Sequence, residues 1–326
     1  MKIATVTLNP AIDQTVRVDQ FQANSVNRAQ AMQFDPGGKG VNVASYLADY
    51  GLEVAATGFL GQENPRTFEA LFQRKGIGDY FVRIPGRTRT NVKIVDEAKQ
   101  QTTDINMRGA TPDGDAIHQL YRVLERLADE YAWFVLTGSL PPAVPEAMYA
   151  ALITQIKSHG ARVVLDTSGA ALQEAVFAVP NVIKPNIHEL EQLVGKELPD
   201  LPAVHVAAQQ LLEGGIELVV VSLGERGALF ADPRQTLLGV PPAVTVKSTV
   251  GAGDAMVAGL LAARAEGLDL AGAAQLATAF AVGAITRVGA HLPPPAALGG
   301  FVRRVKVSPV AEPAPSAVSP GDGAKS

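Results

Sequence analysis

Short runs of β-branched and aliphatic residues alternate with amphipathic helical patterns over the first two thirds of the chain. The runs are typical of buried strands, and the patterns with apolar residues three and four apart are typical of helices. The predicted strands are residues 2–8, 54–59, 133–137, 162–166, 182–184 and 218–222. The predicted helices are residues 41–50, 65–75, 115–131, 145–159, 187–194 and 203–213. This alternation indicates a parallel sheet covered by helices on both faces, which binds ligands at the carboxyl ends of its strands.

Two segments, residues 14–34 and 81–107, break this alternation. Each contains short polar and apolar alternation and leaves no room for a crossover helix, so we expect antiparallel strands. The two segments are alike in character, which predicts one small sheet that projects from the main domain near its ligand edge. Two unrelated hairpins remain the alternative.

The C-terminal third is predicted to be helical over residues 253–266, 270–286 and 295–305. Residues 307–326 lack apolar periodicity and are rich in Pro, Ala and Ser, so we expect a disordered tail. The sequence therefore predicts one α/β domain over residues 1–306 with the small sheet inserted into it.

The charge balance and the apolar runs limit the partners of this chain. Lys and Arg number 28 against 32 Asp and Glu, a net charge of −4, which argues against a broad basic surface for nucleic acid. The first apolar run is too short for a signal peptide, and no stretch approaches the ~18 uninterrupted apolar residues of a membrane span. We therefore expect a cytoplasmic protein that binds neither nucleic acid nor membranes.

Missing residue types exclude several reaction classes. The chain has no cysteine, which removes disulfides, thiolate nucleophiles, iron–sulfur clusters and Cys-based zinc sites. The five histidines, at positions 118, 159, 188, 205 and 291, include no pair at metal-ligand spacing, and no Gly-x-Ser-x-Gly motif is present. Zinc chemistry and serine-hydrolase chemistry are therefore disfavoured.

The strongest local signal is the segment 248–256 (STVGAGDAM), which opens a long helix of small residues. Gly251 and Gly253 free the backbone to point successive N–H groups at one spot, and the helix start adds about half a positive charge. The segment is therefore predicted to bind an anion. Asp254 in the first turn is either a base that accepts a proton beside that anion or a cap of the helix.

A second Gly-rich helix start lies at residues 35–42 (DPGGKGVN). Gly38 and its neighbours let the backbone approach a ligand, Lys39 supplies positive charge, and Asn42 lies one helical turn further on. An ordinary loop also explains this run. Neither a Walker A loop nor a dinucleotide fingerprint is present, so the two Gly-rich starts indicate two separate anionic ligands.

Polar side chains also follow several predicted strands. Asp13 follows the first strand, Asn186 and Glu189 follow a later one, and a Gly-rich turn over residues 222–227 follows the last. Taken singly, Asp13 fits a turn carboxylate, and Asn186 with Glu189 fits a helix cap with its partner. Because all of them follow strands of one sheet, they are expected at one edge, which favours a site.

Seven ordered motifs resemble those of the ribokinase-like (PfkB-type) carbohydrate kinases, and the resemblance extends from about residue 1 to 306. The motifs are residues 9–13 (NPAID), 37–42 (GGKGVN), 87–91 (RTRTN), 137–141 (TGSLP), 184–189 (KPNIHE), 222–227 (SLGERG) and 250–254 (VGAGD). The resemblance implies a three-layer α/β/α sandwich with a mostly parallel central sheet. It also identifies the small antiparallel sheet as that family's β lid.

The resemblance implies a role for each matching residue. Asp254 is the implied catalytic base, beside an anion hole formed by Gly251, Ala252 and Gly253. The implied substrate-binding residues are Asp13, Gly38, Lys39, Asn42, Arg89 and Ser139, with Arg89 holding a phosphate already on the sugar. The implied nucleotide-binding residues are Lys184, Asn186, Ser222, Gly224 and Gly227. Glu189 is the implied Mg²⁺ ligand, through water.

The resemblance is greatest to the sugar-phosphate branch of the family. It implies that the chain uses ATP and Mg²⁺ to phosphorylate fructose 1-phosphate at its 6-hydroxyl, and that it forms a homodimer through the lid. Tagatose 6-phosphate and fructose 6-phosphate remain open as substrates, as does a non-catalytic sugar-phosphate sensor. Asn27 and Arg28 depart from the pattern, because some 6-phosphate kinases of this branch have Lys in that part of the lid.

Overall fold

Strands whose residues are buried on both faces form the centre of the fold. The computed structural model describes residues 1–99, 101–287 and 289–310. The parallel strands of the large sheet are β1 (Ile3–Thr7), β4 (Val54–Gly61), β5 (Gly78–Asp79), β6 (Val82–Ile84), β9 (Trp133–Thr137), β10 (Arg162–Asp166), β11 (Val182–Ile183) and β12 (Leu218–Ser222). The six predicted strands all form, within two residues of their expected bounds.

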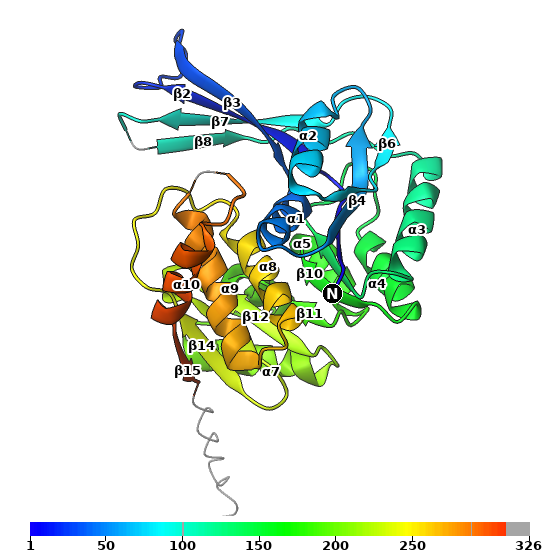
Figure 1. Cartoon of the computed structure of the whole chain (residues 1–326), viewed down its shortest axis with the longest axis vertical. Helices are drawn as coiled ribbons and strands as arrows, with labels where there is room; N and C mark the ends of the chain where they lie inside the picture. The colour runs from blue at the N-terminus through cyan, green and yellow to red at the C-terminus, as the bar shows by residue number, and fades with distance from the viewer. Residues whose placement is uncertain (100, 288, 311–326) are drawn as a thin grey trace, which may run out of the picture.

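Alternate residues of these strands enter two separate hydrophobic cores, which makes a three-layer sandwich (Figure 1). In β9, for example, Val135 faces one core while Phe134 and Leu136 face the other. The helices on the first face are α1 (Lys39–Asp49), α2 (Arg66–Lys75), α8 (Ala252–Ala265), α9 (Leu270–Ile285) and α10 (Pro295–Arg304). The helices on the second face are α3 (Gly114–Ala128), α4 (Met148–Ser158), α5 (Gly169–Val176), α6 (Ile187–Val194) and α7 (Leu201–Glu213). The predicted fold class is confirmed.

Small residues let α8 and α9 pack closely behind the site. A Cβ on Gly259 of α8 would lie 2.6 Å from the Cα of Ala277 in α9, so only glycine fits there. The N-terminus of α8 is thereby held on the sheet at the carboxyl edge, where the N-termini of α1 and α6 also lie.

The lid projects from one end of the sandwich (Figure 1) and contains four strands in the order β3-β2-β7-β8. Their bounds are β2 (Ala11–Val18), β3 (Ala29–Gly37), β7 (Arg89–Asp96) and β8 (Gln101–Ile105). Each hairpin, β2 with β3 and β7 with β8, is antiparallel as expected. The two hairpins join through β2 and β7, however, and this pairing is parallel because both strands leave the main domain in the same direction.

Two expected boundaries are wrong. Residues 81–88 do not enter the lid, since β6 lies there and pairs with β4 of the large sheet. Residues 307–309, expected in the tail, belong to β15 (Lys306–Pro309), which extends the sheet by pairing with β14 (Thr236–Val240). Val307 packs against the first core, which explains why the chain continues along the sheet edge. The rest of the predicted tail, from residue 311, lies outside the described residues.

The strands that extend the large sheet beyond β12 were not predicted from the sequence. β13 (Ala228–Ala231) returns antiparallel from β12, and β14 returns antiparallel from β13. α5 was likewise not predicted.

Across the described part of the chain, no helix is both long and apolar enough to cross a membrane.

Candidate functional site

The N-terminus of α8 presents backbone donors at the carboxyl edge of the sheet. Gly251 is its N-cap, with a φ of 83° that favours glycine, and no side chain caps this helix end. A Cβ on Gly251 would lie 2.8 Å from the Tyr46 hydroxyl. The N–H groups of residues 252–254 belong to the first turn, where helix geometry supplies no intrahelical acceptor. This geometry fits the predicted anion site, and the N-cap residue is Gly251 and not Asp254.

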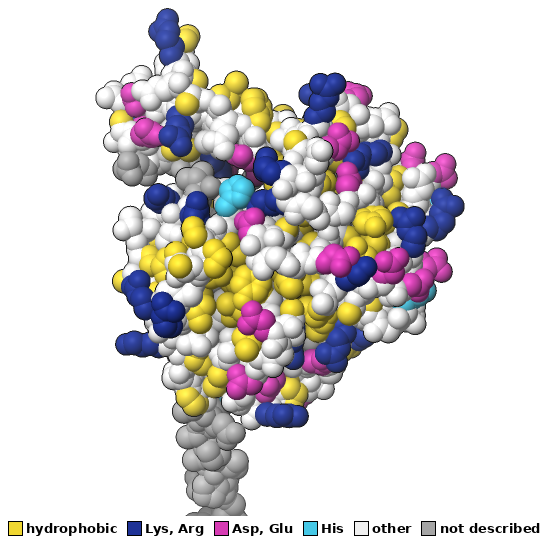
Figure 2. Space-filling view, viewed as in Figure 1, with side chains coloured by type: hydrophobic (Ala, Val, Ile, Leu, Met, Phe, Trp, Pro, Cys, Tyr) yellow, Lys and Arg dark blue, Asp and Glu magenta, His cyan; other side chains and the backbone are white. Residues whose placement is uncertain are grey.

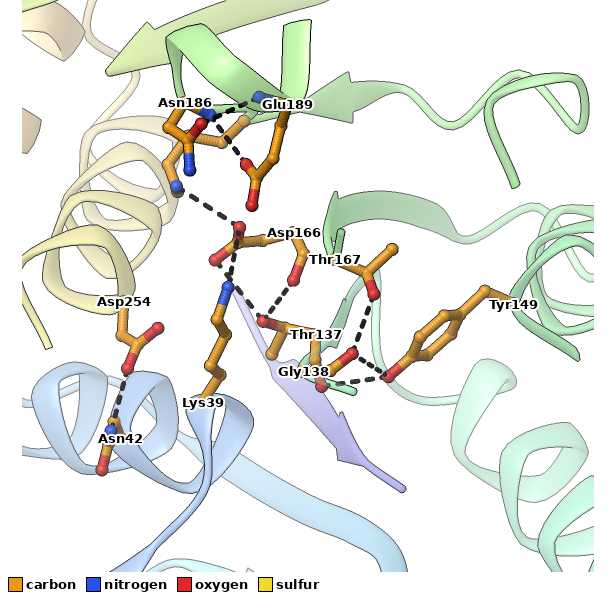
Figure 3. Close-up of polar contacts among 11 residues, drawn as sticks. Lys39, Asn42, Thr137, Gly138, Tyr149, Asp166, Thr167, Asn186, Glu189 and Asp254 are labelled. Atoms are coloured by element: carbon orange, nitrogen blue, oxygen red, sulfur yellow. Dashed lines mark hydrogen bonds and ion pairs between the residues drawn. The ribbon is translucent and has the colours of Figure 1, made fainter. Parts of the chain in front are cut away.

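Asp254 lies in that first turn, is only 6% exposed, and bonds to a side chain of another helix. Asn42 Nδ2 of α1 donates a 2.8 Å hydrogen bond to Asp254 Oδ2 (Figure 3). Burial, followed by the negative charge of Asp166, raises the pKa of Asp254 to about 6. Lys39, Asn42 and Lys184 act in the opposite direction and keep the pKa from rising further. A carboxylate with a pKa near 6 suits a group that accepts a proton near neutral pH.

Asp166, which sequence reasoning missed as a site residue, joins two of the predicted lysines. Its Oδ1 lies 3.5 Å from Lys39 Nζ and 3.3 Å from Lys184 Nζ, and its side chain is 1% exposed. Burial raises the pKa of Asp166, but Lys184 and Lys39 lower it more, so it stays a carboxylate. The sequence feature that could have identified Asp166 is its position as the last residue of a predicted strand, at the edge of the sheet where ligands bind.

The two lysines hold positive charge on either side of Asp166. Burial lowers the pKa of Lys39, but the carboxylate of Asp166 and two further acids raise it more, so the ammonium remains charged. A Cβ on Gly253 would lie 3.3 Å from Lys184 Nζ, so Lys184 lies directly beside the first turn of α8. The predicted anion hole and the predicted Lys184 are therefore brought together.

Asn186 and Glu189 form a complete capping box at the start of α6 (Figure 3). Glu189 N donates to Asn186 Oδ1 at 2.9 Å, and Asn186 N donates to Glu189 Oε2 at 2.8 Å. The helix-cap interpretation is therefore confirmed. It does not exclude a second role, because the Glu189 carboxylate also points toward Asp166 in Figure 3.

The predicted Gly-rich turn lies beside Asn186 at the same sheet edge. Ser222 and Asn186 form an isolated parallel β-bridge through their backbones, and a short 3₁₀ turn, η1 (Gly224–Arg226), follows Ser222. Gly227 has a φ of 95°, and a Cβ there would lie 1.9 Å from the carbonyl oxygen of Gly239. Ser222, Gly224 and Gly227 are thus placed next to the capping box, as expected from the order of the strands.

At the base of the lid, Asp13 lies against the second Gly-rich start. Asn91 Nδ2 donates to Asp13 Oδ1 at 3.2 Å, and a Cβ on Gly37 would lie 2.3 Å from Asp13 Oδ2. Burial raises the pKa of Asp13, although Asn91 and nearby cations oppose this. Gly38, the N-cap of α1, has a φ of 122° that excludes other residues, and it turns the chain from the lid into that helix.

Arg89 is fixed by backbone carbonyls at the root of β7. Its Nη2, Nη1 and Nε donate to the carbonyl oxygens of Asn9 (2.9 Å), Met107 (3.0 Å) and Pro10 (3.3 Å). A guanidinium has five N–H donors, so two remain for a ligand. The Asn9 side chain in turn donates to Ser139 Oγ at 3.2 Å, which places Ser139 on the same network.

The departure at Asn27 and Arg28 lies on the exposed hairpin between β2 and β3. The Asn27 amide bonds back to Gln22, and the Arg28 side chain is exposed. Within the chain, the structure therefore does not bring these two residues to Asp254.

A family model described as "pfkB family carbohydrate kinase" matches residues 6–297, most of the chain. The chain belongs to this family. The pfkB match begins within β1 and ends within α10, so it includes the lid and both Gly-rich helix starts. The family resemblance read from the seven motifs is confirmed, and the chain is a sugar kinase.

Curated relatives within the pfkB family cover nearly the whole chain. The 1-phosphofructokinase of Rhodobacter capsulatus is 48% identical over 94% of this chain and 98% of its own length. The 1-phosphofructokinase of Xanthomonas campestris pv. campestris is 47% identical over 86% of this chain and 90% of its own. Among solved pfkB-like structures, Escherichia coli phosphofructokinase-2 with substrates and products has a TM-score of 0.88 and 31% identity, covering 93% of this chain and 99% of its own.

Proposed function

We propose that this pfkB kinase transfers the γ-phosphoryl group of ATP to the 6-hydroxyl of fructose 1-phosphate, giving fructose 1,6-bisphosphate. The observation that carries the chemistry is the buried Asp254 carboxylate in the first turn of α8, beside backbone N–H groups that have no intrahelical acceptor and no side-chain cap. The 48% identity to a 1-phosphofructokinase over 94% of the chain supports the choice of sugar.

In this proposal Asp254 accepts the proton of the sugar hydroxyl as that oxygen bonds to the γ-phosphorus and ADP departs. The backbone N–H groups of Gly251, Ala252 and Gly253 bind the oxygens of the transferring phosphoryl group. Lys184, beside Gly253, adds positive charge where charge develops. In a loose transition state most of the acceleration comes from positioning and charge stabilisation.

The sugar lies between the base of the lid and α1. The Asp13 carboxylate accepts hydrogen bonds from ring hydroxyls, and the Asn42 amide forms hydrogen bonds with them. Gly38 and Lys39 line the same side of the sugar. The two unused N–H donors of Arg89 bind the phosphate already present on the sugar. Because Arg89 is fixed by three carbonyls, the distance from this phosphate to the reacting hydroxyl is set by the backbone. Ser139 adds a hydroxyl on the Asn9 side.

The nucleotide lies along the carboxyl ends of β11 and β12. Lys184 and Asn186 contact its phosphates, while Ser222, Gly224 and Gly227 flank it. No cluster of three or more His, Asp or Glu side chains in the described ranges forms a metal cage. This fits Mg²⁺, which usually keeps several waters and uses one or two carboxylates with substrate phosphates. Glu189 would hold it through water, and the bound ion would neutralise phosphate charge.

One face of the lid is apolar and exposed, which supports the proposal of a homodimer. Met32 and Phe34 of β3 and Ile105 of β8 are 57%, 48% and 47% exposed, and their register puts them on one face of the lid. The opposite face carries the polar row with Asp13 and Asn91. Figure 2 shows hydrophobic side chains gathered on the projecting lid. We propose that this apolar face packs on the lid of a second copy, and that the enzyme works in the cytoplasm, where ATP and sugar phosphates occur.

The experiment that tests the activity follows fructose 1-phosphate and ATP by phosphorus NMR while ADP release is measured. The proposal expects ADP release in step with growth of a second sugar phosphate resonance, that of a phosphate on carbon 6. Binding of fructose 1-phosphate without ADP release would instead support the sugar-phosphate sensor. ADP release that does not depend on a sugar would contradict the assignment of the acceptor.

A further inference from the structure

Lys75, the last residue of α2, has a buried ammonium that the proposed reaction does not use. Its side chain is only 7% exposed. Nζ lies 2.6 Å from Asp49 Oδ1 and donates to the carbonyl oxygens of Ser45 and Ala290, each at 3.3 Å. A buried charge is costly unless it is paired and hydrogen-bonded, so a fully partnered ammonium indicates a specific role. The three acceptors come from α1 and from the segment that follows α9.

The partners of Lys75 also bind one another. Ser45 Oγ donates to the carbonyl oxygen of Ala290 at 2.7 Å, and Leu292 N donates to Asp49 Oδ2 at 3.0 Å. His291 Nδ1 lies 3.8 Å from the same carboxylate oxygen. The C-terminal half of α1 is therefore fixed to residues 290–292 by side chains that converge on Lys75.

The charges around this cluster are balanced. Burial raises the pKa of Asp49, but hydrogen bonds from His291, Lys75 and the Leu292 N–H lower it below its usual value. Burial lowers the pKa of Lys75, Asp49 raises it by a smaller amount, and the neighbouring Arg74 lowers it slightly. The carboxylate is thus held charged by the groups that face it.

The same face of α1 reaches the reaction centre. Asn42, Ser45, Tyr46 and Asp49 are three or four residues apart, so they follow one another along one side of the helix. At one end Asn42 holds the Asp254 carboxylate, and the Tyr46 hydroxyl fills the space beside Gly251. At the other end Asp49 holds Lys75. A shift of α1 would therefore move the groups that orient Asp254.

The other side of the anion hole is tied to the same region. Ile285, the last residue of α9, accepts hydrogen bonds through its carbonyl oxygen from Lys247 N (2.7 Å) and Ser248 N (3.3 Å). These two residues begin the segment that leads into Gly251. Ala290, an acceptor of the Lys75 ammonium, lies five residues after Ile285 in the sequence.

We propose that Lys75 is a positioning residue that holds α1 and residues 290–292 together and thereby keeps Asn42 bonded to Asp254. This inference rests on the proposed role of Asp254 as the base. Asn42 lowers the pKa of Asp254, so loss of its hydrogen bond raises that pKa. The other charged groups that face Asp254 are Asp166, Lys39 and Lys184. Lys39 is the first residue of α1, and its own ion pair with Asp166 fixes it at the site.

The test measures kcat, both KM values and the pH dependence of kcat for Lys75→Met and Lys75→Arg. We expect Lys75→Met to lower kcat about tenfold at pH 7, to leave KM for ATP within about twofold, to raise KM for the sugar phosphate no more than Asn42→Ala does, and to move the acidic limb of kcat to higher pH. Lys75→Arg keeps the positive charge, so we expect the acidic limb of its kcat to lie close to the wild-type pH. Adding Lys75→Met to Asn42→Ala moves the limb no further than Asn42→Ala alone.

Arg83→Met is the matched control, because Arg83 forms an ion pair of the same 2.6 Å length with Asp79, and its hydrogen bonds go to Asp79, Phe81 and Glu69, which lie outside α1. It leaves kcat and the limb unchanged. If Lys75→Met does not fold, Ser45→Ala removes only the hydroxyl bond to Ala290 and carries the same test with a smaller shift. A fall in kcat or in melting temperature with an unmoved limb overturns the proposal. If Asp254→Asn retains turnover, the proposed function fails instead.

Discussion

Asn42 donates a 2.8 Å hydrogen bond to the buried carboxylate of Asp254, 212 residues further along the chain. The first turns of α1 and α8 thereby meet at one point. The bond fixes the orientation of Asp254. It also lowers the pKa of Asp254, which burial nevertheless raises to about 6. Both effects lead to measurable consequences.

Asp254→Asn should fold normally and lose about 10²–10⁴-fold or more in kcat, because the amide is nearly isosteric but cannot accept a proton. The same substitution should stabilise the protein at pH 8. The pKa of Asp254 is raised on folding, so its ionisation costs up to about 3 kcal/mol above pH 6 and nothing below pH 4. Steady-state kinetics and thermal melts at pH 4.5 and 8 check both parts. A folded variant with more than about a tenth of the wild-type kcat would contradict the role.

The acidic limb of kcat should reflect Asp254 and move in opposite directions in two variants. Asn42→Ala removes a hydrogen bond that lowers the pKa, so its limb should move to higher pH. Asp166→Asn removes a negative charge that raises the pKa, so its limb should move to lower pH. Titration of the substrate phosphates is the same in every variant and cancels in the comparison. Parallel shifts, or none, would assign the limb to another group.

Arg89→Ala should raise KM for the sugar phosphate by about tenfold or more and leave KM for ATP within about twofold. The reason is that in our proposal the two free donors of Arg89 bind only the phosphate on the sugar, while its other donors hold the Asn9, Pro10 and Met107 carbonyls. Initial rates with each substrate varied in turn provide the measurement. Equal increases in the two KM values would show that Arg89 only supports the base of the lid.

Phe34→Glu should convert the proposed dimer into monomers, since it places a charge on the exposed apolar lid face. Gln33→Glu is the matched control, because the neighbouring side chain points to the opposite face of the same strand. Sedimentation velocity at several protein concentrations distinguishes the species. A wild-type chain that sediments as a monomer, or a Phe34→Glu variant that remains dimeric, would rule out this interface.

Much of the fold follows from local pattern. The six strands and the helices between them are visible as runs of residues because burial on both faces demands continuous apolar sequence. The strands β13, β14 and β15 at one end of the sheet were missed because they are only four or five residues long and follow one another without intervening helices, except for β15. Val307 illustrates this, since only its contact with the core distinguishes it from the residues that follow.

The site shows the same division. Gly251, Gly38 and Asp254 were identified because a helix start with glycines has a local physical meaning. Asp166 was missed because its role arises from two lysines distant in sequence, Lys39 and Lys184, which only the folded sheet brings to one carboxylate. The parallel pairing of β2 with β7 was also beyond local pattern, because it depends on how both strands leave the main domain.

The most direct test of the central claim is the ratio of kcat/KM for fructose 1-phosphate to kcat/KM for fructose 6-phosphate, with tagatose 6-phosphate measured alongside. In our proposal Asp254 binds the reacting hydroxyl and Arg89 the existing phosphate, and both classes of ketose carry a phosphate and a primary hydroxyl at opposite ends of a furanose. Ring hydroxyls matched to Asp13 and Asn42 must decide between them, and one unpaired buried group costs about 1–3 kcal/mol. The account predicts a ratio of at least about tenfold in favour of fructose 1-phosphate. A preference for either 6-phosphate would contradict the substrate assignment.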